Sequence, residues 1–409
     1  MVKKMVSSRF LMVFSLTVVI FASTCISAFA SDNLDWGVER IRTQCVWDNN
    51  PMDKTIDNPE RNAGQWISIA VIDTGIDYWI DQWGGKHYHF DLSANVLGGR
   101  GFRHYPGCYV VEEDDHLDYW DGHGTHIVGT IAAVDNDIGL IGAAPRANIY
   151  ALKAVGGSPE GRAKAIAAAI NWSVQHSVKI IVLSWDFRED FAVLREACDN
   201  AYYNNNCLLI ACSGNSDPAY SSVSYPAAYD SVIAVGAVDE NSDRPSWSNY
   251  GEKLEFVAPG VDINSTGLNG GYYADSGTSF AVPHVVGVAA LIWNSKVDPE
   301  YDNDPQNGYW DNTEVRMKLR HFALDLGSEG WDEEYGYGLI NGWATNQRPL
   351  GDLNLDETVD IFDVSTVGLA FGSVPGDPNW TPIADIDINN IVDIFDLMIV
   401  TTHFGEVDP

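Results

Sequence analysis

Short apolar runs recur through the middle of the chain, and each is bounded by turn residues. Between two of these runs, residues 161–177 carry apolar side chains at helical spacing instead. Strands that alternate with helices in this way are typical of a parallel sheet with helices on both faces, because each parallel connection needs a crossover. We therefore predict a doubly wound, mostly parallel α/β fold. The predicted strands are 66–73, 147–155, 179–185, 207–213 and 231–238.

A longer apolar stretch, 280–293, predicts a buried helix with Pro283 in its first turn, where proline is well tolerated. Ser279 directly precedes this stretch. A serine at such a place is usually an N-cap, whose oxygen accepts a backbone N–H. The same hydroxyl could instead be a nucleophile at the edge of the sheet. The local pattern leaves both roles open.

Polar side chains stand at the predicted carboxyl ends of two strands, where doubly wound sheets bind their ligands. Asp73 ends the first run, and Asn215 follows the fourth. His123 lies between glycines at the start of another apolar helix, whereas His126 lies one turn inside it. His123 is therefore the better candidate for a reacting imidazole. Taken singly, each of these residues also has an ordinary structural role in a turn or a helix.

Four segments resemble, in this order, the aspartate, histidine, asparagine and serine motifs of the subtilisin-like serine peptidases. They are AVIDTGID (70–77), GHGTHIVGT (122–130), SGN (213–215) and SGTSFAVPHVVG (276–287). The resemblance implies a catalytic triad with an oxyanion donor, and no cofactor for catalysis. The nucleophile, general base, orienting carboxylate and oxyanion donor would be, respectively, Ser279, His123, Asp73 and Asn215. Thr278 would remain as the helix cap.

The same resemblance implies a substrate-binding role for residues beside the cleft, namely Ser184, Trp185, Asp186 and Gly214. Where the family has glycines along its first specificity pocket, this chain has Asp186 and Phe187. A carboxylate in that pocket would favour Arg or Lys before the cleaved bond. In the alternative arrangement, Asp186 points to solvent and Phe187 fills the space.

Residues 134–142, VDNDIGLIG, resemble the calcium loop that interrupts the helix after the histidine in this family. The implied ligands are all hard oxygens, which calcium prefers. They are the side chains of Asp91 and Asn136 and the carbonyls of Val134, Ile138 and Leu140. An acidic surface loop without metal is the alternative.

Residues 349–409 differ in composition from the rest, with twelve acidic residues and no Lys or Arg. They contain an internal repeat, DLNLDETVDIFD (352–363) and DIDINNIVDIFD (385–396), whose spacing predicts two calcium loops. The repeat resembles a dockerin, a paired-loop module that binds cohesins, although Glu357 and Asn390 replace the usual loop glycine. The candidate ligands are Asp352, Asn354, Asp356, Thr358, Asp360 and Asp363, then Asp385, Asp387, Asn389, Ile391, Asp393 and Asp396. A solvated acidic tail is the alternative.

The first thirty residues run from a basic start through an apolar core to Ala28-Phe29-Ala30, the pattern of a cleaved secretory signal. We predict a signal peptide (1–30), a peptidase domain (31–345), a linker (346–350) and a dockerin-like all-α domain (351–409). A net charge of −33 argues against a nucleic-acid partner, and it favours bound calcium or a saline exterior. Cys45 and Cys108 are a candidate disulfide, whereas Cys212 is predicted to be a core thiol.

Together these features predict an exported, secreted or cell-surface serine endopeptidase that is stabilised by calcium. Its partners would be peptide substrates and a cohesin-like protein that binds residues 351–409, with no membrane span after signal cleavage. Two other functions stay open at this point. One is a subtilisin-like scaffold that binds peptides without cutting them, and the other is an esterase that uses the same triad.

Overall fold

The structure is a computed structural model that describes most of the chain. The predicted signal peptide (1–30), the predicted linker (346–350) and Cys108 lie outside the described residues, as does the side chain of Cys45, so the domain boundaries and this disulfide stay predictions. Among the described cysteines, Cys198, Cys207 and Cys212 are buried free thiols, as predicted for Cys212. The described residues are 33–47, 62–105, 107, 109–119, 121–216, 222–299, 301–304, 307–342, 351, 353, 358–374, 377–380, 384–386 and 391–405.

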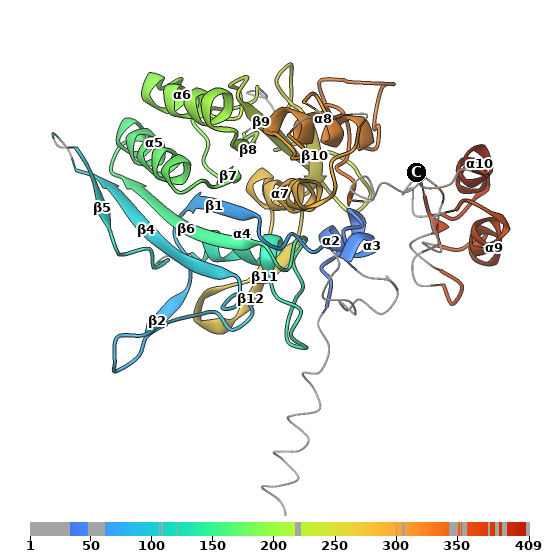
Figure 1. Ribbon diagram of the computed structural model, residues 1–409, viewed down its shortest axis with the longest axis horizontal. Coiled ribbons are helices and arrows are strands. Elements are labelled where there is room, and N and C mark those ends of the chain that lie inside the picture. Colours follow the sequence, from blue (N-terminus) through green and yellow to red (C-terminus); the bar gives the residue numbers. More distant parts are fainter. Residues whose placement is uncertain are drawn as a thin grey trace, which may run out of the picture.

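An eight-stranded sheet forms the centre of the larger unit, in the order β10-β9-β8-β7-β1-β6-β4-β5 (Figure 1). Every neighbouring pair is parallel except β4 with β5, which is antiparallel at one edge. The predicted mostly parallel α/β fold is thus confirmed for this unit. The strands are β1 (Ser68–Asp73), β4 (Val96–His104), β5 (Val110–Glu113), β6 (Asn148–Gly156), β7 (Ile180–Leu183), β8 (Leu208–Cys212), β9 (Val232–Val238) and β10 (Phe256–Pro259).

Two small antiparallel hairpins lie outside the central sheet. They are β2 (Tyr78–Ile80) with β3 (Lys86–Tyr88), and β11 (Ile263–Thr266) with β12 (Tyr272–Asp275). The first hairpin follows β1 directly, so it extends from the strand that ends at Asp73.

Helices cover the two faces of the sheet (Figure 1). α4 (His123–Ala132) and α7 (Thr278–Asn294) pack on each other and on one face, and α5 (Pro159–Gln175) and α6 (Ala192–Asp199) pack together on the other. α8 (Asn312–Phe322) packs against α7. The shorter helical segments are α2 (Trp36–Arg40), α3 (Gln44–Trp47), a π-helical turn (Asn200–Asn204) and a 3₁₀ turn (Leu268–Gly270).

Helix α7 is buried along nearly its whole length, as its uniformly apolar sequence predicts. Its start differs from the prediction, because Gly277 is the N-cap and Thr278 is already helical. Pro283 therefore lies in the second turn rather than the first. The prediction that Thr278 caps the helix is also wrong, since no side chain caps this end and the Thr278 hydroxyl bonds elsewhere.

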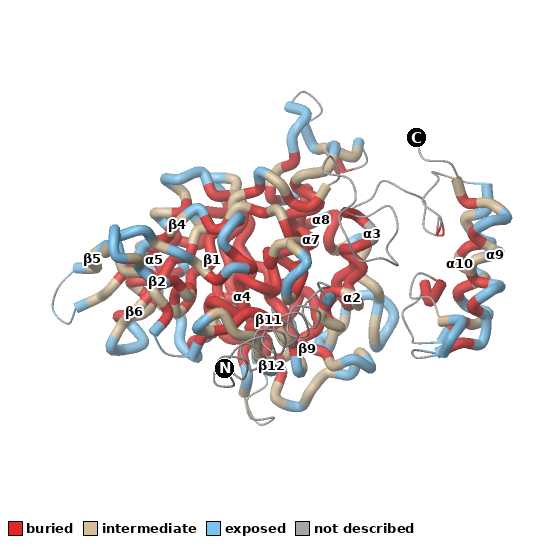
Figure 2. Tube along the Cα trace, turned by 90° about the horizontal axis from the view of Figure 1, so that it is seen from below, coloured by how far each residue is buried: buried red, intermediate tan, exposed pale blue. Residues whose placement is uncertain are grey.

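The apolar core of the larger unit runs through the sheet and along α4 and α7 (Figure 2). Across the described part of the chain, none of the helices combines the length and the apolarity that a membrane crossing requires.

A second, smaller unit contains α9 (Ile361–Ala370) and α10 (Ile394–Thr402), which pack side by side away from the sheet (Figure 1). Two hydrogen bonds reproduce the sequence repeat in reciprocal form. The Gly372 N–H donates to the Val392 carbonyl at 2.7 Å, and the Gly405 N–H donates to the Val359 carbonyl at 2.8 Å. Each repeat thus donates one backbone hydrogen bond to the other repeat. Its described core consists of Leu353, Val359, Val367, Ala370, Ala384, Ile386, Val392 and Val400.

Candidate active site

Three elements bring together the side chains that the motifs predicted to be catalytic. Asp73 ends β1, His123 begins α4, and Ser279 lies in the first turn of α7. His123 Nε2 lies 2.9 Å from Ser279 Oγ, and His123 Nδ1 lies 2.8 Å from Asp73 Oδ1. The chain of contacts has the geometry of a nucleophile, a base and an orienting carboxylate. It favours the second of the two roles considered for Ser279, because its hydroxyl faces the imidazole and caps no helix.

The charges around His123 favour its imidazolium form. Burial by itself opposes a charge on the ring, but the charge and hydrogen bond of Asp73 outweigh it. Asp121 and Asp118 add further negative charge, so the pKa of His123 is raised above its ordinary value. This environment stabilises the cation that forms when the base takes a proton.

His126 has a structural position, as its place inside the helix predicted. It is fully buried, and its Nε2 lies 2.9 Å from the carbonyl of Ile263. Burial lowers the pKa of His126 to about 4, so the ring stays neutral. Its hydrogen bond ties α4 to β11 rather than to the reacting groups.

The amide of Asn215 is oriented by Thr278, a residue whose role the sequence did not reveal. Asn215 Oδ1 accepts hydrogen bonds from the Thr278 N–H and from the Thr278 hydroxyl, both at 2.9 Å. A Cβ built on Gly277 would lie 3.2 Å from Asn215 Nδ2 and 3.3 Å from Ser279 Oγ. The amide donor and the Ser279 hydroxyl thus border one small space, which glycine leaves open. Gly214, next in the chain, donates its N–H to the Thr278 hydroxyl at 3.1 Å.

A buried carboxylate, Asp118, holds the turn that follows Asp73. The Thr74 hydroxyl donates to Asp118 Oδ2 at 2.8 Å and accepts the Gly124 N–H at 3.0 Å. This connection links the end of β1 to the first turn of α4, which begins at His123. No local motif indicates it, because Thr74 lies far from Asp118 and Gly124 in the chain.

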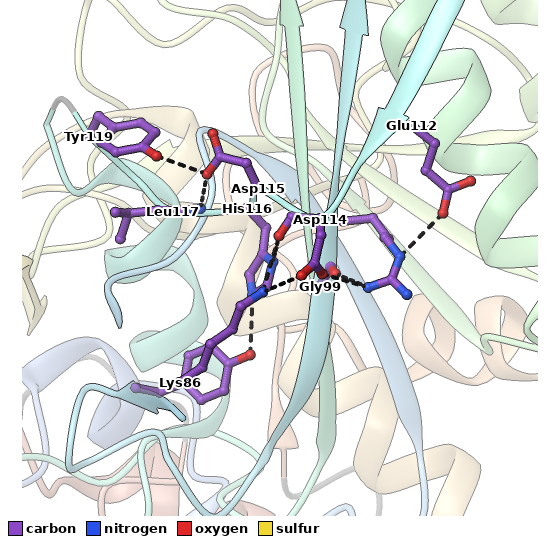
Figure 3. A network of polar contacts seen from close by, with 10 residues as sticks. Lys86, Gly99, Glu112, Asp114, Asp115, His116, Leu117 and Tyr119 are labelled. Carbon is purple, nitrogen blue, oxygen red and sulfur yellow. Dashed lines mark hydrogen bonds and ion pairs between the residues drawn. The ribbon is translucent and has the colours of Figure 1, made fainter. Parts of the chain in front are cut away.

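A polar network supports the segment that leads to Asp118 (Figure 3). His116 is buried at its centre, with ring nitrogens 3.1 Å from the Tyr88 hydroxyl and 3.3 Å from the Asp114 carbonyl. Burial, assisted by the charge of Lys86, lowers the pKa of His116 to about 4. The neutral ring therefore serves packing and hydrogen bonding in this network, and it contacts none of the triad residues.

The predicted substrate-binding residues Ser184, Trp185 and Asp186 continue irregularly from the end of β7. Asp186 is exposed, whereas Phe187 is buried and pairs with Tyr225 across an antiparallel bridge. This arrangement is the alternative in which Phe187 fills the space. Partial desolvation nevertheless raises the pKa of Asp186. Its predicted contact with a basic substrate residue requires it to turn toward the cleft and stays a prediction.

The predicted calcium loop of the larger unit folds around Asp91, which is fully buried. Asp91 Oδ1 accepts from Asn136 Nδ2 at 3.1 Å, and Asp91 Oδ2 accepts the Leu140 N–H at 3.1 Å. The structure thus brings Asp91 to the loop that carries the predicted carbonyl ligands, Val134, Ile138 and Leu140. The described residues contain no cluster of three or more His, Cys, Asp or Glu side chains that could hold a metal ion. A ligand set made mainly of carbonyl and amide oxygens contains no such cluster.

The predicted calcium loops of the smaller unit are described only in part. Asp352, Asn354, Asp356, Asp387 and Asn389 lie outside the described residues. The described candidates are Thr358, Asp360, Asp363, Asp385, Ile391, Asp393 and Asp396.

The described carboxylates of these two loops repeat one geometry. Asp363 and Asp396, the last residue of each loop, are fully buried. Asp363 Oδ1 accepts the Leu353 N–H at 2.6 Å, and Asp396 Oδ1 accepts the Ile386 N–H at 2.5 Å. Asp363 and Asp396 also complete capping boxes at the starts of α9 and α10. The two loops therefore close in the same way.

Fold and site together define a doubly wound α/β protein that carries the Asp–His–Ser constellation of a serine hydrolase at its strand ends. The model of the Subtilase family matches residues 64–338. The chain belongs to this family, and it is a serine endopeptidase of the subtilisin type.

Relatives cover most of the chain. Subtilisin Savinase of Lederbergia lenta is 34% identical over 317 residues, which are 78% of this chain and 100% of that protein. Subtilisin DY of Bacillus licheniformis is 37% identical over 286 residues, or 69% of this chain and 92% of that protein. The Minor extracellular protease Epr of Bacillus subtilis (strain 168) is 36% identical over 311 residues, or 76% of this chain and 41% of that protein.

Proposed function

We propose that this protein is an exported endopeptidase that cleaves peptide bonds through an acyl-enzyme formed on Ser279. The observation that carries the proposal is the continuous contact from Ser279 Oγ through His123 to Asp73, with distances of 2.9 Å and 2.8 Å. A serine hydroxyl is a weak nucleophile at neutral pH, so it needs a base within hydrogen-bonding reach. His123 Nε2 meets this requirement.

In the first step, Ser279 Oγ attacks the carbonyl carbon of the scissile bond while His123 Nε2 accepts the hydroxyl proton. Asp73, hydrogen-bonded to Nδ1, keeps the ring in the tautomer whose Nε2 is free to accept, and it stabilises the resulting imidazolium. His123 then donates the proton to the leaving amine, and the acyl group stays on Ser279. In the second half of the reaction, a water molecule that gives its proton to the same imidazole attacks the acyl carbon. The imidazolium then returns the proton to Ser279 Oγ as the carboxylic acid product leaves.

The negative charge that develops on the substrate oxygen needs donors that are already in place. Asn215 Nδ2 is suited to this role, because Thr278 holds the other end of the amide and Gly277 leaves the space beside Ser279 Oγ open. The Ser279 N–H, at the positive end of α7, is the second expected donor. A single donor of this kind contributes about 3 kcal/mol to transition-state stabilisation.

We further propose that calcium binds the loop around Asp91. The donors would be the Asp91 carboxylate, the Asn136 side chain and the carbonyls of Val134, Ile138 and Leu140. Their chemistry fits calcium, since all are hard oxygens and the carboxylate is withdrawn from water. The ion would hold residues 134–140 to the start of the segment 91–96 and would take no part in the chemical steps.

For the smaller unit, we propose a calcium-binding, dockerin-like module that tethers the enzyme to a cohesin-like protein outside the cell. The repeated closure of the loops by Asp363 and Asp396 supports the paired-loop assignment. Each helix also exposes an equivalent apolar pair in its first turn, Ile361 with Phe362 and Ile394 with Phe395. Exposed apolar residues in matching places are suited to partner binding.

The proposal is tested by comparing casein digestion with the hydrolysis of a simple ester, for the wild-type protein and Ser279→Ala. We expect the wild-type protein to degrade casein and Ser279→Ala to lose both activities while it stays folded by circular dichroism. Ester hydrolysis without casein cleavage would support the esterase instead. A folded wild-type protein that binds peptides and hydrolyses neither substrate would support the non-catalytic scaffold.

A further inference from the structure

A cationic side chain lies beside the segment that leaves β7 toward the candidate active site. β7 lies between β1 and β8, with Leu183 paired to Ile72 and Ala211. The next residue, Ser184, is therefore level with Asp73. Trp185 follows it, and so lies one residue further along the edge of the site. A peptide held at the strand ends by Ser279 would pass along this segment.

Arg162 approaches Trp185 from helix α5. It lies in the first turn of α5, which follows β6, and β6 flanks β1 on the side away from β7. The Arg162 guanidinium carbon lies 4.5 Å from the centroid of the Trp185 ring. Stacking of this kind fixes the plane of the guanidinium and leaves its N–H edge available for a carboxylate.

Among the described residues, Arg162 forms no close ion pair, although the charge of Asp186, the residue after Trp185, acts on it at longer range. Within the described ranges, no carboxylate lies within ion-pair distance of its guanidinium, although the chain carries a net charge of −33. Lys164, on the same helix, pairs with Glu160 at 2.7 Å, so that carboxylate is already engaged. Arg162 as a whole is half-buried, and partial burial strengthens a charge-assisted hydrogen bond.

We propose that Arg162, positioned by Trp185, binds an acidic side chain of the substrate. The acidic residue would lie on the acyl side of the cleaved bond, further upstream than the residue directly before that bond. This inference rests on the proposed endopeptidase function and names its substrate class: peptides with Asp or Glu at that upstream position.

The test is cleavage-site profiling of a peptide library, followed by kcat/KM for matched peptides that differ only by Glu or Gln at the preferred upstream position. We expect wild type to prefer Glu, and Arg162→Gln to lower the Glu-to-Gln ratio of kcat/KM by about tenfold. Arg162→Lys should keep part of the preference, since it keeps the charge but loses the planar fork. High salt should reduce the ratio for wild type.

Lys179→Gln is the matched control. Lys179 also lies over a tryptophan ring, with Nζ 5.4 Å from the Trp293 centroid, but it precedes β7 at the end of the strand away from Ser184. This variant should keep the wild-type ratio. Cleavage without an upstream acidic preference, or a preference that Arg162→Gln retains, would overturn the inference while leaving the endopeptidase function intact. Absence of cleavage of every peptide by the folded protein would contradict the proposed function itself, and the inference with it.

Discussion

The two units of this protein bury carboxylates for different purposes. In the larger unit, Asp73 lies at the end of a strand within an extensive apolar core, and it orients the imidazole of His123. In the smaller unit, Asp363 and Asp396 are buried beside a core in which only eight described apolar residues are buried together. Asp73 is held in place by the fold around it, whereas Asp363 and Asp396 help to stabilise the fold of the smaller unit.

This difference follows from size. A large sheet covered by helices on both faces buries enough apolar surface to hold a charged group in place. Two short helices with little core usually need metal or disulfides for independent stability. We therefore expect the stability of the smaller unit to depend on calcium, and the activity of the larger unit to depend on a few oriented atoms that contribute little to its stability.

The largest effect should come from removing calcium. If calcium binding supplies most of its folding free energy, as we propose, chelation should unfold the smaller unit. α9 and α10 should then lose their protection against hydrogen exchange. Buried α7 should stay protected in the same full-length sample. Mass-spectrometric hydrogen exchange, with and without chelator, measures both regions together. Equal protection of α9 and α10 under both conditions would contradict the calcium-dependent fold.

Chelating calcium also tests the proposed calcium site in the loop around Asp91. If this loop holds an ion, the thermal midpoint of the larger unit should fall with chelator, while its sheet remains folded at room temperature. Asp91→Asn should lower the midpoint in calcium and should make it less sensitive to chelator. A thermal midpoint that is the same with and without chelator in the wild-type protein would contradict the proposal that this loop binds calcium.

Asn215→Ala should have little effect on the stability of the fold but a large effect on the catalytic rate. This change should lower kcat by about 100-fold or more and leave KM nearly unchanged, because the amide acts on charge that develops only in the transition state. Thr278→Ser, which keeps the hydroxyl that orients Asn215, is the control and should stay close to wild type. Steady-state kinetics on one peptide substrate measure both variants. A main effect of Asn215→Ala on KM would contradict the oxyanion role.

The smallest effect concerns the pH dependence. Because nearby carboxylates raise the pKa of His123, the neutral base should predominate only above the ordinary imidazole pKa, and kcat/KM should rise over that range. Asp121→Asn removes one of these charges but keeps a side-chain oxygen that can accept the backbone N–H of His123. It should move the rising limb to lower pH by about half a unit.

Glu196→Gln, an exposed change on α6, is the control for the removal of one surface charge. Its pH profile of kcat/KM should coincide with that of wild type. If Asp121→Asn left the limb in place or moved it to higher pH, the electrostatic account of His123 would be wrong.

Much of the sheet was predictable from apolar runs, because buried parallel strands are continuously apolar. The run 147–155, for example, matches β6 to within one residue at each end. β4 was missed because it contains several glycines instead of an apolar run. A side chain at Gly99 would collide with the His116 ring, and one at Gly101 would collide with the Asp115 carbonyl. These glycines are therefore explained only by residues that the fold brings close.

The candidate site divides in the same way. Ser279, His123, Asp73 and Asn215 could be predicted as site residues because each belongs to a local motif. Thr278 was given the wrong role, since its contact with Asn215 joins two segments that are distant in sequence. The link between Thr74 and Asp118 was missed for the same reason. Local patterns identify the groups that react, whereas the groups that orient them become apparent only in three dimensions.

The role of Ser279 as the nucleophile of a working triad can be measured by labelling the folded protein with a fluorophosphonate and mapping the adduct by peptide mass spectrometry. We expect one adduct, on Ser279, that disappears in His123→Ala because the base is lost. Labelling of another residue, or no labelling of folded wild-type protein under conditions in which a known serine peptidase reacts, would contradict this role.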